Sequence, residues 1–256
     1  MILTVLGCWA PYPRPGGACS GYLLQSGETA IMIDAGNGTF AELTRHVNFR
    51  SLKALVITHF HPDHYVDVFC LRHAIAGARR AGTLQQTLKL FVPAAPSEIY
   101  NKLASYTDAF TVTAVEQLPE TRQLGIHAKW AKLDNTEMFF VPTAHALPGY
   151  ALLVRRNGKS FFFSGDTAAT DQITLAAGDS DLFLCEASGL DQDKEYLAGI
   201  HMTAREAGLT AQKAKVKKLV ITHFWPEYEL SDLLAQAGEG FNGDVTAAIQ
   251  GMKVNL

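Results

Sequence analysis

Short apolar runs alternate with segments of helical periodicity along the whole chain, and this alternation limits the folds that the chain can adopt. The run 54–57, Ala-Leu-Val-Ile, is apolar without interruption, which is typical of a strand buried on both faces of a sheet. Asn157-Gly158 between the runs 150–155 and 160–163 predicts a tight hairpin turn. Hairpins combined with strand–helix units predict an α/β protein of the α+β type, with two mixed sheets packed together and helices outside.

The same patterns give the expected elements. No repeat, low-complexity tract or linker interrupts them, so we expect residues 1–256 to form one domain. Ser97 is the expected N-cap of its helix. The expected helices are 40–47, 63–80, 97–106, 171–177, 203–215 and 231–238. The expected strands are 2–6, 21–25, 30–33, 54–57, 88–92, 126–133, 137–143, 150–155, 160–163, 182–185, 219–221 and one near Val245.

Composition excludes several classes of protein. Of the 256 residues, 48% are hydrophobic and 18% are charged, a balance that buries a core and excludes intrinsic disorder. No apolar run reaches the roughly 18 residues that a membrane-spanning helix needs. The net charge of −3 argues against nucleic-acid binding through the whole protein surface, although it does not exclude a local basic patch. Without a recognisable export signal, the four scattered cysteines predict buried, reduced thiols and a cytoplasmic protein.

The strongest chemical signal directly follows the run 54–57. The chain there reads Thr-His-Phe-His-Pro-Asp-His and then enters a predicted helix. His59 and His61 are two residues apart, so on an extended backbone they point the same way. Asp63 and His64 begin the helix and turn towards the same point. Imidazole nitrogens combined with carboxylate oxygens suit zinc, manganese or iron, so the segment predicts a metal site.

Three further polar residues occupy comparable positions. His145 follows the run 137–143, and Asp166 and His223 follow two other apolar runs. Loops at strand ends place functional groups on a rigid sheet. The seven candidate ligands are too many for one tetrahedral ion and sufficient for two ions that share a carboxylate. They are His59, His61, Asp63, His64, His145, Asp166 and His223.

The order of these motifs resembles the metallo-β-lactamase fold superfamily: HxHxDH, a later lone histidine, Gly-Asp-Thr and a final histidine. The resemblance covers essentially the whole chain. It implies a four-layer αββα sandwich with a site for two divalent metal ions, zinc first, with manganese or iron as alternatives. It assigns His59, His61 and His145 to one ion, Asp63, His64 and His223 to the other, and Asp166 to the bridge between them.

Other segments resemble the ribonuclease Z branch of that superfamily. His145 is followed by Pro and Gly-Tyr, as in that branch. The segment 184–188, Leu-Cys-Glu-Ala-Ser, resembles its His-Glu-Ala-Thr motif, and the segment around His201 resembles its His-Ser-Thr motif. The resemblance implies that His201 protonates the leaving group, that Glu186 orients it, and that Asp63 orients or deprotonates the nucleophile. A structural hydrogen bond for His201, an outer-shell contact for Glu186 and a ligand-only role for Asp63 are the alternatives.

Two segments depart from ribonuclease Z. The long arm that binds the tRNA elbow in that family has no counterpart, because a short hairpin occupies residues 146–165. The segment 8–17 is rich in Pro and Gly and differs from the family's N-terminal motif. The resemblance nevertheless implies a binuclear hydrolase, a phosphodiesterase that acts through a metal-bridging hydroxide. The expected substrates are RNA ends or small or cyclic phosphodiesters.

Other assignments stay open. A lactonase or a thioesterase of the same fold is the alternative reading, and a non-enzymatic metal-binding scaffold is a third. The branch that the chain resembles often dimerises, so we expect a homodimer and no membrane partner.

Overall fold

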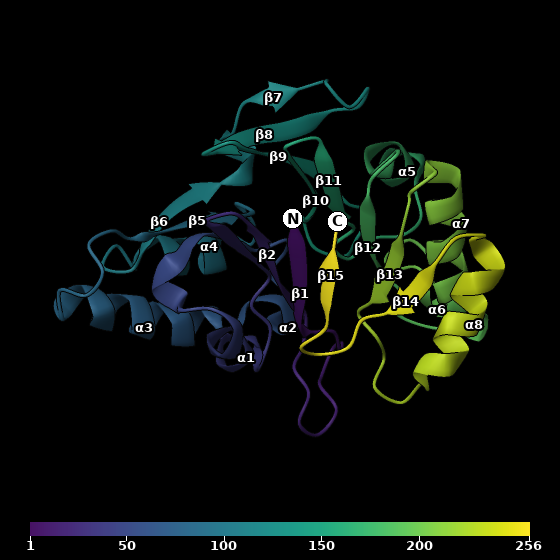
Figure 1. Cartoon of the computed structure of the whole chain (residues 1–256), viewed down its shortest axis with the longest axis horizontal. Coiled ribbons are helices and arrows are strands. Elements are labelled where there is room, and N and C mark those ends of the chain that lie inside the picture. Colours follow the sequence, from purple (N-terminus) through teal and green to yellow (C-terminus); the bar gives the residue numbers. More distant parts are fainter. The chain divides into compact units, whose positions relative to one another are not determined.

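The computed structural model describes residues 1–256, and their contacts group them into two compact units. Unit 1 comprises Met1–Leu118 and Gln250–Asn255, and unit 2 comprises Pro119–Ile249 together with Leu256. Each unit holds one β-sheet and its own helices (Figure 1). The expected α/β class with two mixed sheets is therefore confirmed, whereas a single domain over the whole chain stays a prediction.

The sheet of unit 1 is antiparallel on one side and parallel on the other. Its strand order is β15-β1-β2-β3-β4-β5-β6, with parallel pairing from β3 to β6. Parallel neighbours end at the same edge of a sheet, so the loops that follow β3 and β4 emerge side by side. The strands are β1 (Ile2–Gly7), β2 (Gly21–Ser26), β3 (Thr29–Ile33), β4 (Leu52–Val56), β5 (Leu88–Val92), β6 (Phe110–Ala114) and β15 (Lys253–Asn255).

The helices of unit 1 bury an apolar face in one hydrophobic cluster. Leu71 and Ile75 of α3 belong to this cluster together with Leu55 of β4 and Leu90 of β5, and all four are essentially inaccessible to solvent. The cluster fixes the strand from which the histidine-rich loop departs. The helices are α1 (Thr39–His46), α2 (Pro62–Tyr65), α3 (Val68–Arg80) and α4 (Ser97–Ala104), with 3-10 turns η1 (Phe49–Ser51) and η2 (Val115–Gln117).

The sheet of unit 2 repeats this combination of antiparallel and parallel pairing. Its order is β14-β13-β12-β11-β10-β9-β8-β7, antiparallel from β7 to β11 and parallel from β11 to β14. Because β9 and β11 are both antiparallel to β10, the two run in the same direction. The strands are β7 (Glu120–Thr121), β8 (Ala128–Leu133), β9 (Thr136–Pro142), β10 (Tyr150–Arg156), β11 (Lys159–Phe163), β12 (Leu182–Glu186), β13 (Leu219–Thr222) and β14 (Val245–Ala247).

In unit 2 the helices α7 and α8 lie beside the parallel part of the sheet, whereas α5 contacts β9, β10 and α7 (Figure 1). The hydroxyl of Thr203 accepts a hydrogen bond from the backbone N–H of Glu206, whose carboxylate accepts one from the N–H of Thr203. This reciprocal pair fixes the start of α7. The helices are α5 (Asp171–Ala177), α6 (Lys194–Leu197), α7 (Ala204–Ala214) and α8 (Leu230–Gly240), with a 3-10 turn η3 (Asp191–Asp193).

The structure differs from the expected elements at several places. The predicted helix 63–80 is two helices, because the N–H of Asp67 donates to the carbonyl of Ala35 rather than to the preceding turn. Ser97 is the first residue of α4, and its N-cap is Pro96. The strands β6, β7 and β15, all at a sheet edge, were not expected; β7 and β15 hold only two and three residues. Cys70 is exposed, unlike the other three cysteines. None of the helices is long and apolar enough to cross a membrane.

Two glycines bring α7 and α8 into close contact. A Cβ atom added to Gly208 would lie 2.2 Å from the carbonyl oxygen of Ala237 in α8. A Cβ atom added to Gly240 would lie 2.6 Å from the backbone nitrogen of Leu209 in α7. The two helix backbones therefore approach to a distance that only residues without a side chain permit.

We expect Gly208→Ala to lower the free energy of unfolding by about 1–3 kcal/mol, because the new methyl group forces the two helices apart. Gly238→Ala in α8 is the matched control, since its Cβ atom would meet nothing within 4 Å. There alanine should stabilise the protein by about 0.5–1 kcal/mol through its helix propensity. Urea denaturation of the two variants measures both values, and an equal loss in both would contradict the close packing.

Candidate metal centre

The loop after β4 brings four of the predicted ligands together in unit 1. Nε2 of His59 lies 3.0 Å from Nδ1 of His61. Nε2 of His64 lies 3.6 Å from a carboxylate oxygen of Asp63, and the ring centroids of His59 and His64 are 4.2 Å apart. Two nitrogens bound to one tetrahedral zinc ion at its usual bond length would lie about 3.3 Å apart. The spacing of His59 and His61 is therefore close to that of two ligands of one ion.

Asp34 orients these imidazoles, although the sequence analysis did not identify it. Its Oδ2 accepts hydrogen bonds from Nδ1 of His64 at 2.7 Å and from the hydroxyl of Thr58 at 2.9 Å. The hydroxyl oxygen of Thr58 lies 3.2 Å from Nδ1 of His59 and can accept a hydrogen bond from the N–H there. With the Nδ1 atoms of His59 and His64 so engaged, the Nε2 lone pairs are left for a metal ion.

The carboxylate of Asp34 is completely buried. Burial raises its pKa above the usual value, although the neighbouring His64 and Thr58 lower it. Asp34 follows the apolar strand β3, as Asp166 follows β11. This position after a strand is the sequence signal that could have identified Asp34 as a candidate site residue.

The backbone around Asp34 explains how the loops after β3 and β4 fit together. The φ angle of Asp34 is 56°, in the left-handed region that aspartate tolerates better than most residues. The N–H of Ala35 donates to the carbonyl of His64 at 2.7 Å. A Cβ atom on Gly36 would lie 2.0 Å from the carbonyl oxygen of Asp63, so only glycine fits there. The loop after β3 is therefore locked against the two ligands that begin α2.

Unit 2 contributes a second cluster from the ends of its strands. Asp166 follows β11 and His223 follows β13, and Nε2 of His223 lies 3.1 Å from Oδ2 of Asp166. His145 follows β9, and its Nε2 lies 3.9 Å from the same oxygen. Asp166, His201 and His223 offer ligand atoms that all lie within 4.8 Å of one another. The common edge of parallel and like-directed strands therefore brings together residues 145, 166 and 223.

Glu186 is the buried carboxylate of this cluster. It is the last residue of β12 and is 0% exposed. Nδ1 of His201 lies 3.0 Å from its Oε2, and the backbone N–H groups of Met202 and Thr167 also donate to the carboxylate. These donors compensate for the loss of solvation that a buried carboxylate suffers.

The two histidines beside this carboxylate have opposite pKa shifts. Burial alone would lower the pKa of His201, but the charge and hydrogen bond of Glu186 raise it above its ordinary value. Burial lowers the pKa of His145 despite the nearby Asp166. Nδ1 of His145 donates to the carbonyl of Ile200 at 2.8 Å. His145 is therefore suited to ligation as a neutral ring through Nε2, and His201 is suited to proton donation.

The residues present fit divalent metal ions. Both clusters combine imidazole nitrogens with carboxylate oxygens, the donor set of zinc, manganese and iron sites. The Nδ1 atoms of His59, His64 and His145 are each directed at a hydroxyl, carboxylate or carbonyl oxygen. Such contacts fix the tautomer and the orientation of metal-binding histidines.

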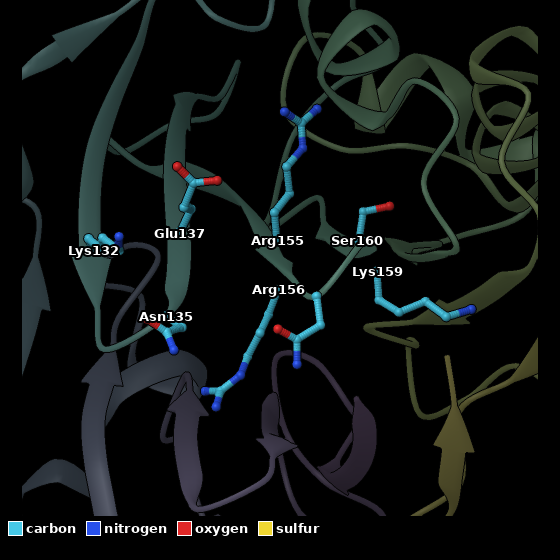
Figure 2. Close-up of a pocket in the computed structure, with 9 residues that line it drawn as sticks. Lys132, Asn135, Glu137, Arg155, Arg156, Lys159 and Ser160 are labelled. Atoms are coloured by element: carbon cyan, nitrogen blue, oxygen red, sulfur yellow. The ribbon is translucent and has the colours of Figure 1, made fainter.

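A basic pocket of about 470 Å³ lies elsewhere in unit 2. Arg155 and Arg156, at the end of β10, point in opposite directions there (Figure 2). The seven residues of β10 span roughly 20 Å, so the pocket is remote from the loop that carries His145. It contains none of the predicted site residues. The residues that line it are Lys132, Asn135, Glu137, Arg155, Arg156, Asn157, Gly158, Lys159 and Ser160.

We expect Asp34→Asn to weaken zinc binding about 10–100-fold, the usual cost of losing an outer-shell partner of a metal ligand. The matched control is Asp67→Asn in the same unit, because the Asp67 carboxylate accepts from the N–H of Phe40 at 2.8 Å and so holds the start of α1. Competition with a chromophoric chelator measures both affinities. Equal affinities in the two variants would contradict the role of Asp34.

Comparisons with known proteins agree with this fold. The model of the beta-lactamase superfamily domain matches residues 29–224. The chain is 28% identical over 252 residues to the probable metallo-hydrolase YhfI of Bacillus subtilis, with 98% of each chain covered. The crystal structure of YhfI gives a TM-score of 0.90 at 25% identity, covering 99% of this chain and 98% of that chain.

Ribonucleases Z are also among the relatives. The ribonuclease Z of Myxococcus xanthus is 26% identical over 298 residues, covering 99% of this chain and 97% of its own. The structure of the short form of human tRNase Z has a TM-score of 0.76 at 20% identity, with coverage of 100% and 99%, and is similar in fold. The predicted resemblance is therefore confirmed: the chain belongs to the beta-lactamase superfamily.

Proposed function

We propose that this protein is a metal-dependent phosphodiesterase with a binuclear centre. The two clusters described above would supply the ligands, and the superfamily match over residues 29–224 contains both of them. Each cluster alone holds too few groups for two ions. We assign His59, His61 and His145 to one ion, Asp63, His64 and His223 to the other, and Asp166 to the bridge.

Divalent ions at such a site would lower the pKa of water and offset charge that develops on phosphoryl oxygens. The protein's own groups would do the rest. In this proposal, Asp63 orients the nucleophile, and His201 gives its proton to the departing alkoxide. Glu186 holds Nδ1 of His201, which leaves Nε2 to face the leaving group.

The Glu186–His201 pair is the observation that carries the choice of phosphodiester chemistry. Its carboxylate is buried, and it raises the pKa of His201 beside Asp166 and His223. An alkoxide is a poor leaving group unless it is protonated, whereas the thiolate that leaves a thioester depends less on such an acid. The ribonuclease Z relatives support the same choice.

The segment between His145 and Asp166 favours a small or flexible substrate. It contains only β10, the Asn157-Gly158 turn, β11 and short loops. The segment has no long arm that could bind a folded tRNA. We therefore infer that the substrates are RNA ends or small or cyclic phosphodiesters.

A substrate panel tests the proposal. Purified protein loaded with zinc or manganese is incubated with bis(p-nitrophenyl) phosphate, cyclic nucleotides, short RNAs, lactones and thioesters. We expect turnover of phosphodiesters and little or none of the acyl substrates. Faster hydrolysis of a lactone or thioester would favour the alternative acyl hydrolase, and no turnover at all would favour a metal-binding scaffold.

We expect His201→Ala to reduce phosphodiester cleavage about 10²–10⁴-fold, the usual contribution of a general acid. Its metal content should stay unchanged, because His201 is assigned as an acid rather than as a ligand. His73→Ala in α3 replaces an exposed histidine outside both clusters and serves as the control. Elemental analysis measures the metal content of each sample, and kinetics on the same samples measure its activity. Loss of one metal ion from His201→Ala would show that His201 is a metal ligand rather than the acid.

We expect two divalent ions per chain by elemental analysis. Their removal with a chelator should abolish turnover and lower the midpoint of thermal unfolding, since ions that bind only the folded state stabilise it. Zinc or manganese should restore both properties. A stoichiometry of one ion would contradict the binuclear centre.

A further inference from the structure

Ser188 lies where Glu186, His201 and His223 meet, and the proposed function gives it no role. Its hydroxyl oxygen lies 2.5 Å from Oε2 of Glu186, 2.9 Å from Nδ1 of His223 and 3.2 Å from Nδ1 of His201. Its backbone N–H donates to the carbonyl of Met202 at 3.0 Å. The residue is therefore held between the end of β12 and the segment before α7.

The hydrogen atoms at this point can be assigned. A serine hydroxyl has one hydrogen, and an ionised carboxylate can only accept. The 2.5 Å contact therefore takes the hydrogen of Ser188 to Glu186. The hydroxyl oxygen is then an acceptor for the N–H at Nδ1 of His223, 2.9 Å away. This leaves the lone pair of His223 on Nε2, the atom that lies 3.1 Å from Asp166.

The arrangement repeats that of unit 1 with different residues. Asp34 holds His64 directly and reaches His59 through the hydroxyl of Thr58. Glu186 holds His201 directly and reaches His223 through the hydroxyl of Ser188. In each unit one buried carboxylate, extended by one hydroxyl, contacts the Nδ1 atoms of two imidazoles.

We propose that Ser188 is a positioning residue that fixes the Nδ1–H tautomer of His223 and couples this metal ligand to the Glu186–His201 pair. The inference rests on the proposed function for His223 as a ligand. Without the hydroxyl, Nδ1 of His223 loses the Ser188 oxygen as an acceptor and Glu186 loses a donor, so neither residue then fixes the tautomer of the ring. The affinity of the ion assigned to His223 should then fall.

The test compares the zinc-loaded wild-type protein with Ser188→Ala, Ser188→Thr and Ser188→Cys. Chelator competition measures zinc affinity, and long-range proton–nitrogen correlation spectra, recorded after the zinc has been removed, report the tautomer of His223. We expect Ser188→Ala and Ser188→Cys to bind one of the two ions about 10–100-fold more weakly and to lose the Nδ1–H signal of His223. Ser188→Thr keeps the hydroxyl and should restore both to near wild-type values.

Ser180→Ala is the matched control, because Ser180 is a buried serine of the same unit whose hydroxyl has no hydrogen-bond partner. Its zinc affinity should equal that of the wild type. Wild-type zinc affinity and tautomer in a folded Ser188→Ala or Ser188→Cys variant would overturn the inference. If the wild type cleaves no phosphodiester while Ser188→Ala still weakens zinc binding, the inference holds and the proposed reaction fails.

Discussion

Each unit of this protein is organised around one buried carboxylate. Asp34 and Glu186 are both inaccessible to solvent, and an isolated charge in that position would be strongly destabilising. Each is compensated by several donors: at least one backbone N–H, a hydroxyl and an imidazole Nδ1. The need to satisfy the carboxylate therefore fixes the surrounding loops, and the loops in turn fix the histidine rings.

The hydrogen bonds that compensate the buried carboxylates also explain why Nε2 of several histidines is left without a proton. A neutral imidazole has one donor and one acceptor nitrogen. When Nδ1 is committed to a carboxylate, hydroxyl or carbonyl oxygen, Nε2 carries the lone pair. His59, His64, His145 and His223 all have such a partner at Nδ1. If these rings bind the proposed ions, the contacts at Nδ1 would hold them in the required tautomer and would reduce the cost of assembling the centre.

Strand direction supplies the scaffold for this network. In unit 1, β3 and β4 are parallel neighbours, so Asp34 and the loop that carries His59 leave the sheet at one edge. In unit 2, β11, β12 and β13 are parallel neighbours, which places Asp166, Glu186 and His223 at one edge. These positions follow from backbone pairing alone. Asp34 and His223 also share a left-handed backbone, with φ angles of 56° and 62°, and their side chains reach His64 and Asp166 respectively.

Local sequence patterns were sufficient to predict most of the elements and the seven candidate ligands. Apolar runs such as 54–57 and the dense HxHxDH segment depend on local periodicity and spacing, which are readable without coordinates. The contacts of Asp34 and of Ser188 became visible only in the tertiary structure, because their partners are distant in sequence. His64 is 30 residues from Asp34, and His223 is 35 residues from Ser188. The break between α2 and α3 was decided in the same way, since the N–H of Asp67 pairs with Ala35. A hydrogen bond between distant segments leaves no periodic trace in either segment, so only the folded backbone reveals it.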